Sequence, residues 1–120
     1  MLSSLSLPVL AGLLFTPVLI AAGQVLFKLA SRSTGGTDLA GLAGLLVNPF
    51  LIAALAIYGT GTIIWIYLLK SVPLNYAYPF MALTFCFVPV LAWIFLGEAP
   101  TLRLAIGTGL VLVGLFVIAR

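Results

Sequence analysis

Long apolar stretches alternate with short polar connections along this sequence of 120 residues. A helix needs about 20 residues to cross the hydrocarbon core of a bilayer, and the apolar stretches have that length. Strands of a membrane barrel would instead alternate polar and apolar residues, which these stretches do not. The pattern therefore predicts four transmembrane helices, at about 7–29, 50–69, 74–96 and 104–119.

The polar connections carry signals for helix starts. The segment SRSTGGTD ends the first span, and Thr37 or Asp38 is suited to cap a short helix at 38–46. The segment LAGLAGLL that follows is too short to cross a bilayer, so we expect it to lie in the membrane interface. Asn48 and Pro49 open the second span, because proline fits the first turn of a helix.

Composition selects the fold class and excludes several functions. Hydrophobic residues make up 64% of the chain and charged residues only 6%, so the predicted class is an all-α, multi-pass membrane protein. With no histidine and one cysteine, Cys86, the chain offers almost no zinc or haem ligands and no disulfide. Five cations do not make a nucleic-acid surface, and no nucleophile, base and orienting group can be assembled. We therefore expect no enzyme, no metal site, no cofactor and no nucleic-acid partner.

Basic residues fall at both predicted membrane faces. Lys70 and Arg120 belong to one face, and Lys28, Arg32 and Arg103 belong to the other. This bias is weak under the positive-inside rule, so charge does not fix the orientation. Dual topology and an inverted partner both stay open.

Four short spans enclose little volume, so a pathway for a sizeable substrate predicts a second copy or a partner subunit. In the last span, Gly107 and Gly114 are a heptad apart and lie on nearly one face, where missing side chains let another helix approach closely. That helix belongs either to a second subunit or to the same chain. The small size of the protein favours a dimer.

Three polar residues recur at helical spacing where the first span ends. Gln24, Lys28 and Arg32 are each four residues apart and therefore share a helix face. Lys28 either extends its ammonium to the lipid head groups or, together with Arg32, binds an anionic lipid head. Arginine can hold phosphate through two N–H groups, and lysine acts as a point charge. Gln24, one turn deeper, supplies a neutral donor and acceptor.

The third span begins with prolines among polar side chains. Pro79 and Pro89 each remove a backbone donor and can break or kink the helix. Asn75 and Tyr78 lie near the start of this span. They belong either to an interfacial aromatic belt or to a cavity lined by a broken helix.

The two carboxylates of the chain, Asp38 and Glu98, both lie in predicted connections. Proton-coupled export of cations generally needs a carboxylate inside the membrane. Glu98 is expected in a solvated turn or in an ion pair with Arg103 or Lys28, and it is also a candidate for contacting substrate.

Three segments, AAGQVLFKLAS, YLLKSVPLNYAYPFMAL and FLGEAPTLRLAIGTGLVLVGLFVIA, together resemble the drug/metabolite transporter superfamily. Its small four-span, EamA-like members share the Gly-Gln-x-x-x-Lys ending of span one and the short turn before AYP. They also share a Gly/His-Glu turn before a glycine-spaced last helix. The likeness covers nearly the whole chain and is strongest to the small subunits of the flippase for aminoarabinose-phospho-undecaprenol.

The sister branch, the small multidrug resistance transporters, works as antiparallel dimers and has a glutamate in span one. This chain has Ile20 there, three residues before the matching Gly23. The binding-site tyrosine of that branch matches Tyr78, but the tryptophan three residues later is Met81. Loss of the glutamate argues against proton-coupled drug export, and Gln24 favours the lipid-flippase branch.

The resulting hypothesis is a transporter subunit that flips a polyprenyl-phosphate-linked sugar, or a related anionic lipid, across a bacterial inner membrane. Lys28 and Arg32 would attract the phosphate, and Gln24, Asn75 and Tyr78 would offer hydrogen bonds to the head. The partner would be a second copy or a similar small subunit. Two alternatives remain, namely a small exporter of cationic compounds that uses Glu98 or no proton coupling, and a non-transporting scaffold.

Overall fold

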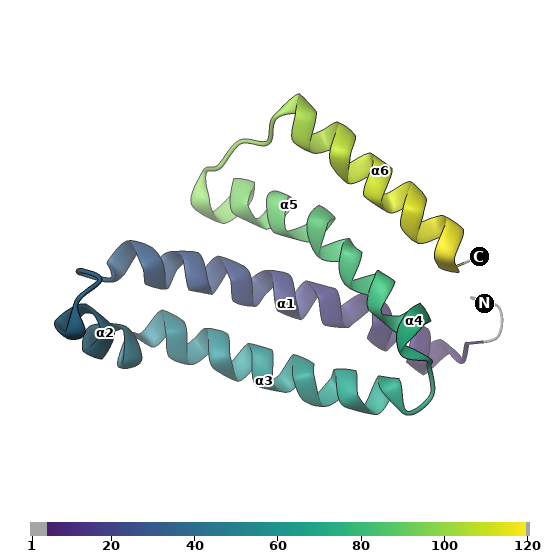
Figure 1. Cartoon of the computed structure of the whole chain (residues 1–120), viewed down its shortest axis with the longest axis horizontal. Helices are drawn as coiled ribbons and strands as arrows, with labels where there is room; N and C mark the ends of the chain where they lie inside the picture. Colours follow the sequence, from purple (N-terminus) through teal and green to yellow (C-terminus); the bar gives the residue numbers. More distant parts are fainter. Residues whose placement is uncertain (1–4, 120) are drawn as a thin grey trace.

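The computed structural model describes residues 5–119, and all regular structure in this range is helical (Figure 1). The elements are α1 (Leu7–Ser33), α2 (Leu39–Leu46), α3 (Pro49–Leu69), α4 (Leu74–Ala77), the 3-10 helix η2 (Tyr78–Leu83), α5 (Thr84–Leu96) and α6 (Leu102–Ala119). Four helical stretches are long and apolar enough to cross a membrane: 7–33, 49–69, 74–96 and 102–119. The predicted all-α membrane class is therefore confirmed. Arg120, which the sequence assigned to the same face as Lys70, lies outside the described residues.

Polar side chains fix the connection between α1 and α3. Asp38 caps α2 by accepting a hydrogen bond of 3.0 Å from the Gly41 N–H. Asn48 accepts one of 2.9 Å from the Phe50 N–H, and its amide donates to the Ser33 hydroxyl at 2.7 Å. Asn48 is buried, and these two bonds satisfy its amide oxygen and nitrogen. The same residue therefore starts α3 and ties it to the end of α1.

The third apolar stretch is not one uniform α-helix. After the short α4, the backbone tightens into η2 around Pro79 and returns to α-helical geometry at Thr84. Proline lacks the N–H that an α-helix requires, which explains why the change occurs at this position. The Thr84 hydroxyl donates to the Met81 carbonyl at 2.7 Å across the junction. The broken form of this span, which the prolines suggested, is thus present.

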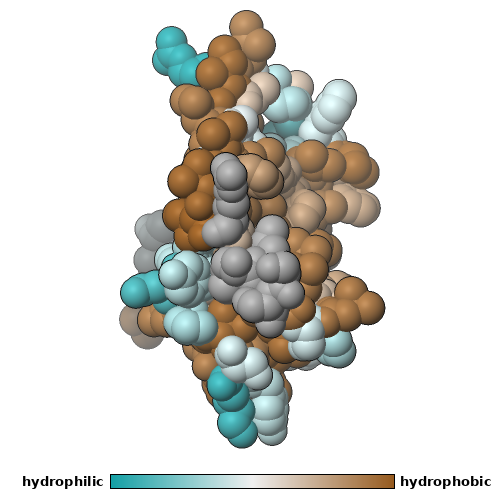
Figure 2. All heavy atoms as spheres, turned by 90° about the vertical axis from the view of Figure 1, so that its right-hand side faces the viewer, coloured by the Kyte–Doolittle hydropathy of each residue, from teal (hydrophilic) through white to brown (hydrophobic). Residues whose placement is uncertain are grey.

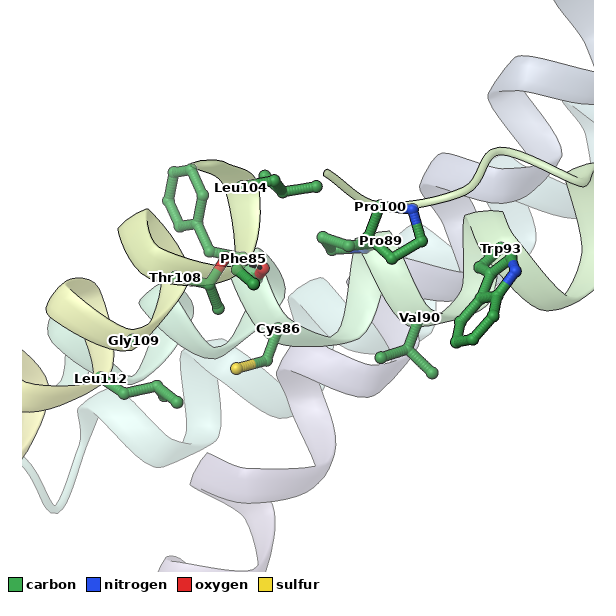
Figure 3. Close-up of a pocket in the computed structure, with 11 residues that line it drawn as sticks. Phe85, Cys86, Pro89, Val90, Trp93, Pro100, Leu104, Thr108, Gly109 and Leu112 are labelled. Carbon is green, nitrogen blue, oxygen red and sulfur yellow. Dashed lines mark hydrogen bonds between the residues drawn. The ribbon is translucent and has the colours of Figure 1, made fainter. Parts of the chain in front are cut away.

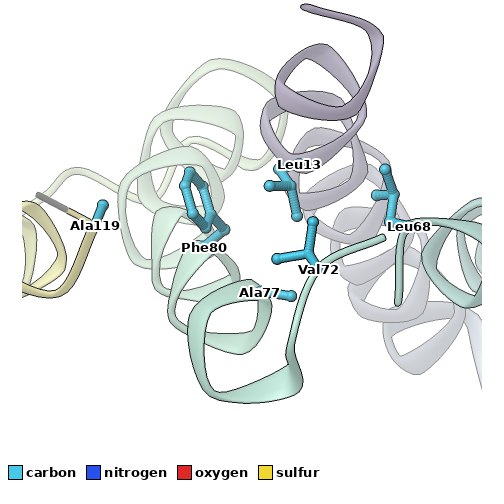
Figure 4. Close-up of a cluster of buried hydrophobic side chains, with 6 residues drawn as sticks. All are labelled: Leu13, Leu68, Val72, Ala77, Phe80 and Ala119. Carbon is cyan, nitrogen blue, oxygen red and sulfur yellow. The ribbon is translucent and has the colours of Figure 1, made fainter. Parts of the chain in front are cut away.

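A cluster of buried hydrophobic side chains lies at one end of the bundle, while Ala21, Val25, Ala30 and Ala54 are buried further along α1 and α3. α1 and α3 run side by side and antiparallel, and the side chains of the cluster come from both helices, from the turn after α3, and from α4, η2 and α6 (Figures 1 and 4). They are Leu13, Leu68, Val72, Ala77, Phe80 and Ala119. We call this the α4 end of the molecule. The opposite end, which holds Arg32, Asn48 and Glu98, we call the α2 end.

Apolar side chains also cover much of the outer surface (Figure 2). On α6 these include Leu110, Val113 and Val117, all more than 60% exposed. In water such a surface would be costly, whereas hydrocarbon chains accommodate it. The exposed apolar surface and the small core are therefore both consistent with a bilayer as the solvent.

Candidate functional site

The central feature of the site is a contact between α1 and α3 that joins Gln24 to Tyr58. The Gln24 amide nitrogen donates a hydrogen bond of 2.6 Å to the Tyr58 hydroxyl oxygen. Gly23 makes the close approach possible, because a Cβ at this position would lie 2.7 Å from Tyr58 Cδ2 and 2.8 Å from Cε2. The ring of Phe27 lies 5.3 Å from the Tyr58 ring, at an interplanar angle of 38°. Gly23, Gln24 and Phe27 of α1 thus all contact Tyr58 and fix its position.

The hydrogen bond leaves donors available to a ligand. The Tyr58 oxygen accepts from Gln24, so the hydroxyl hydrogen of Tyr58 is free to donate elsewhere. Gln24 is exposed and retains a second N–H and its carbonyl oxygen. The pair therefore offers two N–H or O–H donors to an acceptor such as a phosphate or sugar oxygen.

Sequence reasoning identified Gln24 but missed Tyr58. In the sequence Tyr58 is one aromatic residue in an apolar span, and no charged or amide side chain at helical spacing marks it. The usable signal was Gly23, since a glycine inside a span often marks the close approach of another helix. Only the register of α1 against α3 shows which residue makes that approach.

Lys28 lies one helical turn beyond Gln24, which is about 6 Å along the axis of α1. Its side chain is exposed, and within residues 5–119 no carboxylate lies within ion-pair distance of its ammonium. Gln24 and Lys28 share the face of α1 that the sequence predicted, so the cation and the Gln24–Tyr58 donors lie on one side of the helix. That side can bind an anionic group.

Arg32 and Glu98 form an ion pair at the α2 end. Arg32 Nη2 lies 3.6 Å from Glu98 Oε2 and 3.5 Å from the Leu96 carbonyl oxygen. The sequence placed Glu98 in a solvated turn or in an ion pair with Arg103 or Lys28. Glu98 does lie exposed in the turn after α5, but its partner is Arg32 and not Arg103 or Lys28. α1 continues to Ser33, beyond the expected end at about residue 29, and this extension brings Arg32 to the end of α5.

Asn75 and Tyr78 lie at the α4 end, away from Lys28. They flank Ala77, which packs in the same buried cluster as Leu13. Fifteen residues of α1 separate Leu13 from Lys28, a distance of about 22 Å along a helix. Both Asn75 and Tyr78 are exposed, Tyr78 by 66%. The structure therefore does not join these two residues to Gln24, Lys28 and Arg32 in one site.

The glycines of α6 face open space. A Cβ at Gly107 or Gly114 would meet no atom within 4 Å, so neither glycine serves close packing within the described part of the chain. Beside them, α5 and α6 border an apolar groove of about 360 Å³ (Figure 3). A hydrogen bond of 3.3 Å from the Thr108 hydroxyl to the Phe85 carbonyl joins the two helices there. Cys86 and Trp93 lie on the α5 side of this groove.

No metal-binding cluster accompanies these features. Within residues 5–119, no three histidine, cysteine, aspartate or glutamate side chains come together. The described site presents cations and hydrogen-bond donors on a membrane helix.

Comparison with known sequences assigns the family. The sequence profile of the EamA-like transporter family matches residues 4–120. This chain belongs to that family. The resemblance inferred from the three sequence segments is thus confirmed, and the chain is a multi-pass membrane protein of a transporter family.

Similar proteins carry a more specific name, "Probable 4-amino-4-deoxy-L-arabinose-phosphoundecaprenol flippase subunit ArnE". The protein of that name from Klebsiella pneumoniae (strain 342) is 31% identical over 106 residues, which cover 88% of this chain and 91% of the relative. The one from Enterobacter sp. (strain 638) is 26% identical over 106 residues, covering 88% and 92%. The one from Yersinia pestis (strain Pestoides F) is 33% identical over 70 residues, covering 58% and 61%. No solved structure matches this chain.

Proposed function

We propose that this EamA-like protein is a subunit of a flippase that moves a polyprenyl-phosphate-linked sugar, or a related anionic lipid, across the bacterial inner membrane. The relatives named as flippase subunits support this substrate class. The observation that carries the proposal is the exposed Lys28 beside the Gln24–Tyr58 pair on a membrane-spanning helix. The Lys28 ammonium can attract a phosphate, and the free N–H of Gln24 and O–H of Tyr58 can donate hydrogen bonds to phosphate or sugar oxygens.

The physical task matches these parts. The polyprenyl tail remains in hydrocarbon throughout, so only the polar head needs a path through the membrane. Lys28 and Arg32 attract the phosphate at the α2 end, and Gln24 and Tyr58 replace part of its hydration one turn deeper. Asn75 and Tyr78 lie at the α4 end and cannot contact the head group while Lys28 and Arg32 hold it at the α2 end. In this proposal, the residues of the α4 end contact it only after it has crossed.

A second subunit completes the path. The α1 face with Gln24 and Lys28 is exposed, and the α6 face with Gly107 and Gly114 has no neighbour within the described chain. A charged face exposed to lipid is costly, so a partner covering it would be stabilising. We propose that this partner is another copy of the chain or a similar small subunit, and that its helix packs on the glycines of α6.

The observations do not favour export of cationic compounds. Both carboxylates of the chain lie outside the four long helices: Asp38 caps α2 and Glu98 follows α5. A cation crossing along the four long helices would meet Lys28 toward the α2 end and would find no carboxylate side chain of this chain within those helices. The scaffold alternative predicts no lipid movement with any partner.

Translocation in proteoliposomes tests the proposal. The assay compares a labelled polyprenyl-phosphate sugar with a quaternary ammonium dye, for the wild type, Lys28→Ala and Lys70→Ala. Lys70 is the matched control, because it is the other lysine and sits at the end of α3 over Tyr67, 5.6 Å from the ring. We expect Lys28→Ala to lower the lipid rate by roughly tenfold or more, as for loss of one charged hydrogen-bond partner, with little effect of Lys70→Ala. Dye movement without lipid movement would refute the flippase. Equal rates for the two variants would refute the role of Lys28.

A further inference from the structure

An apolar groove runs between α1 and α5 toward the α2 end of the molecule. The two helices lie side by side (Figure 1), and the groove between them has a volume of about 290 Å³. All the side chains that line it are hydrocarbons: Ala22, Val25, Leu26, Leu29, Leu91 and Phe95. A lipid chain is as apolar as leucine and packs against such a surface through van der Waals contacts.

The ion pair of Arg32 and Glu98 lies where this groove ends. Leu29 of the groove is one helical turn before Arg32, about 5 Å along α1. On the other side, Phe95 of the groove belongs to the end of α5, just before Glu98. Arg32 Nη2 also reaches the Leu96 carbonyl and so joins the ends of the two helices. A lipid chain in the groove therefore brings its polar head to these two charges.

Both charges are open to such a head group. The Arg32 and Glu98 side chains are 50% and 48% exposed, and their contact of 3.6 Å is longer than a charge-assisted hydrogen bond of about 2.7–2.9 Å. Among the described residues, only Nη2 of the guanidinium has a partner, and Glu98 uses only Oε2. Exposed pairs of this kind contribute little to stability. A ligand that supplies both opposite charges can therefore replace the contact at little cost.

The backbone holds the carboxylate in place beside the groove. α5 ends at Gly97, whose φ of 71° is left-handed, a conformation that glycine adopts without strain. The N–H groups of Gly97 and Glu98 both donate to the Ala92 carbonyl, the latter at 3.2 Å. Arg32 belongs to the last turn of α1. The two charges thus sit on the ends of the two helices that form the groove.

We propose that the groove and the ion pair together bind phosphatidylethanolamine, a phospholipid of the surrounding membrane with a primary ammonium. Its phosphate accepts two N–H groups of Arg32, its ammonium donates to Glu98, and one acyl chain fills the groove. Every charge then keeps an opposite partner.

Charge complementarity selects this phospholipid over others. An anionic phospholipid would place its phosphate beside Glu98 without a cation to compensate the carboxylate, and the two anions would repel each other. A choline head group carries its charge on a methylated nitrogen that has no N–H, so it cannot donate a hydrogen bond to Glu98. Glu98 therefore acts as the residue that determines the head group.

This site lies on a different face of α1 from Lys28. Around the helix, Leu29 is about 100° and Leu26 about 160° from Lys28. Lys28 therefore stays open to a transported lipid while the phospholipid occupies the groove. Arg32 is the one residue that the two proposed sites share, so a substrate phosphate that binds Arg32 must first displace the phosphate of the phospholipid. Binding of the phospholipid itself does not depend on the proposed function.

Native mass spectrometry of the full chain in detergent tests the proposal by counting bound phospholipid. The probes are phosphatidylethanolamine, phosphatidylcholine and phosphatidylglycerol with the same acyl chains. The wild type should bind phosphatidylethanolamine about tenfold more tightly than phosphatidylcholine, the ratio expected from one hydrogen bond between charged groups. Glu98→Gln should bring this ratio close to one. Asp38→Asn is the matched control, because it removes the other carboxylate, retains a good helix cap and should keep the preference.

A second variant tests the groove. Ala22 is half-buried in the groove wall, and Ala22→Phe adds a ring where the acyl chain would lie. It should weaken binding of all three phospholipids by roughly tenfold and leave the ratio between them unchanged.

The outcomes distinguish this site from the proposed function. Equal binding of phosphatidylethanolamine and phosphatidylcholine by the wild type, or an unchanged ratio in Glu98→Gln, would overturn the site. Tighter binding of phosphatidylglycerol would also overturn it, since Arg32 alone would then select the lipid. Wild-type binding by Ala22→Phe would place the acyl chain outside the groove, and a dimer that retains no phospholipid would indicate that a second subunit covers it. Lys28→Ala should still bind phosphatidylethanolamine, although the proposed function requires it to lose transport, so either proposal can fail without the other.

Discussion

Replacing Gly23 with alanine should disrupt the contact that builds the site. The added Cβ would lie 2.7 Å from Tyr58 Cδ2, about 0.7 Å short of the 3.4 Å at which ordinary contact begins. The Tyr58 ring cannot turn away freely, because Phe27 packs against it and Gln24 holds its hydroxyl. α1 and α3 must therefore separate locally, at a cost of about 1–3 kcal/mol for overpacking.

Thermal unfolding in detergent measures this cost. For a chain of this size, about 1 kcal/mol corresponds to a fall in Tm of a few degrees, so we expect Gly23→Ala to lower Tm by roughly 3–12 °C. Gly59→Ala is the matched control. It also lies within a long helix, its Cβ would meet nothing within 4 Å, and alanine is the better helix former. It should leave Tm unchanged or raise it slightly.

A double-mutant cycle tests whether the clash with the Tyr58 ring is the cause of the fall in Tm. In a Tyr58→Ala background the ring is gone, so adding alanine at position 23 should cost almost nothing further. The coupling between the two substitutions should then be about 1–3 kcal/mol. If Gly23→Ala lowers Tm equally with and without the Tyr58 ring, the clash is not the cause and the packing argument is refuted.

Two further predictions concern the donors and the assembly. Tyr58→Phe keeps the ring against Gly23 but removes the hydroxyl that accepts the hydrogen bond from Gln24. Lipid transport should therefore fall by roughly fivefold, while Tm stays within a few degrees of the wild type. A transport rate equal to that of the wild type would contradict a role for the hydroxyl. Gly107→Leu combined with Gly114→Leu should leave the fold of the chain intact, because both positions face open space. If a second copy packs on these glycines, as proposed above, the double substitution should lower the dimer fraction measured by crosslinking and light scattering, and an unchanged oligomeric state would place the interface elsewhere.

The sequence by itself determined the membrane class. Apolar length and scarce charge allow only helices in a bilayer, since backbone groups in hydrocarbon must be satisfied within each span. Local signals also set particular residues: Asp38 caps α2, Asn48 and Pro49 start α3, and Pro79 lies where the α-helix gives way to 3-10 geometry. Gln24 and Lys28 share a face because helical periodicity is a local property.

Contacts between helices were decided only by the tertiary structure. Tyr58 reaches Gln24 because of the register of α1 against α3, which depends on packing at Gly23 and leaves no periodic signal in either helix. Glu98 pairs with Arg32 because α1 extends further than hydropathy suggested, since polar residues can continue a helix past the hydrocarbon boundary. A sequence pattern reports which residues share one helix, whereas distances between helices depend on how their surfaces pack, which is a property of the whole chain.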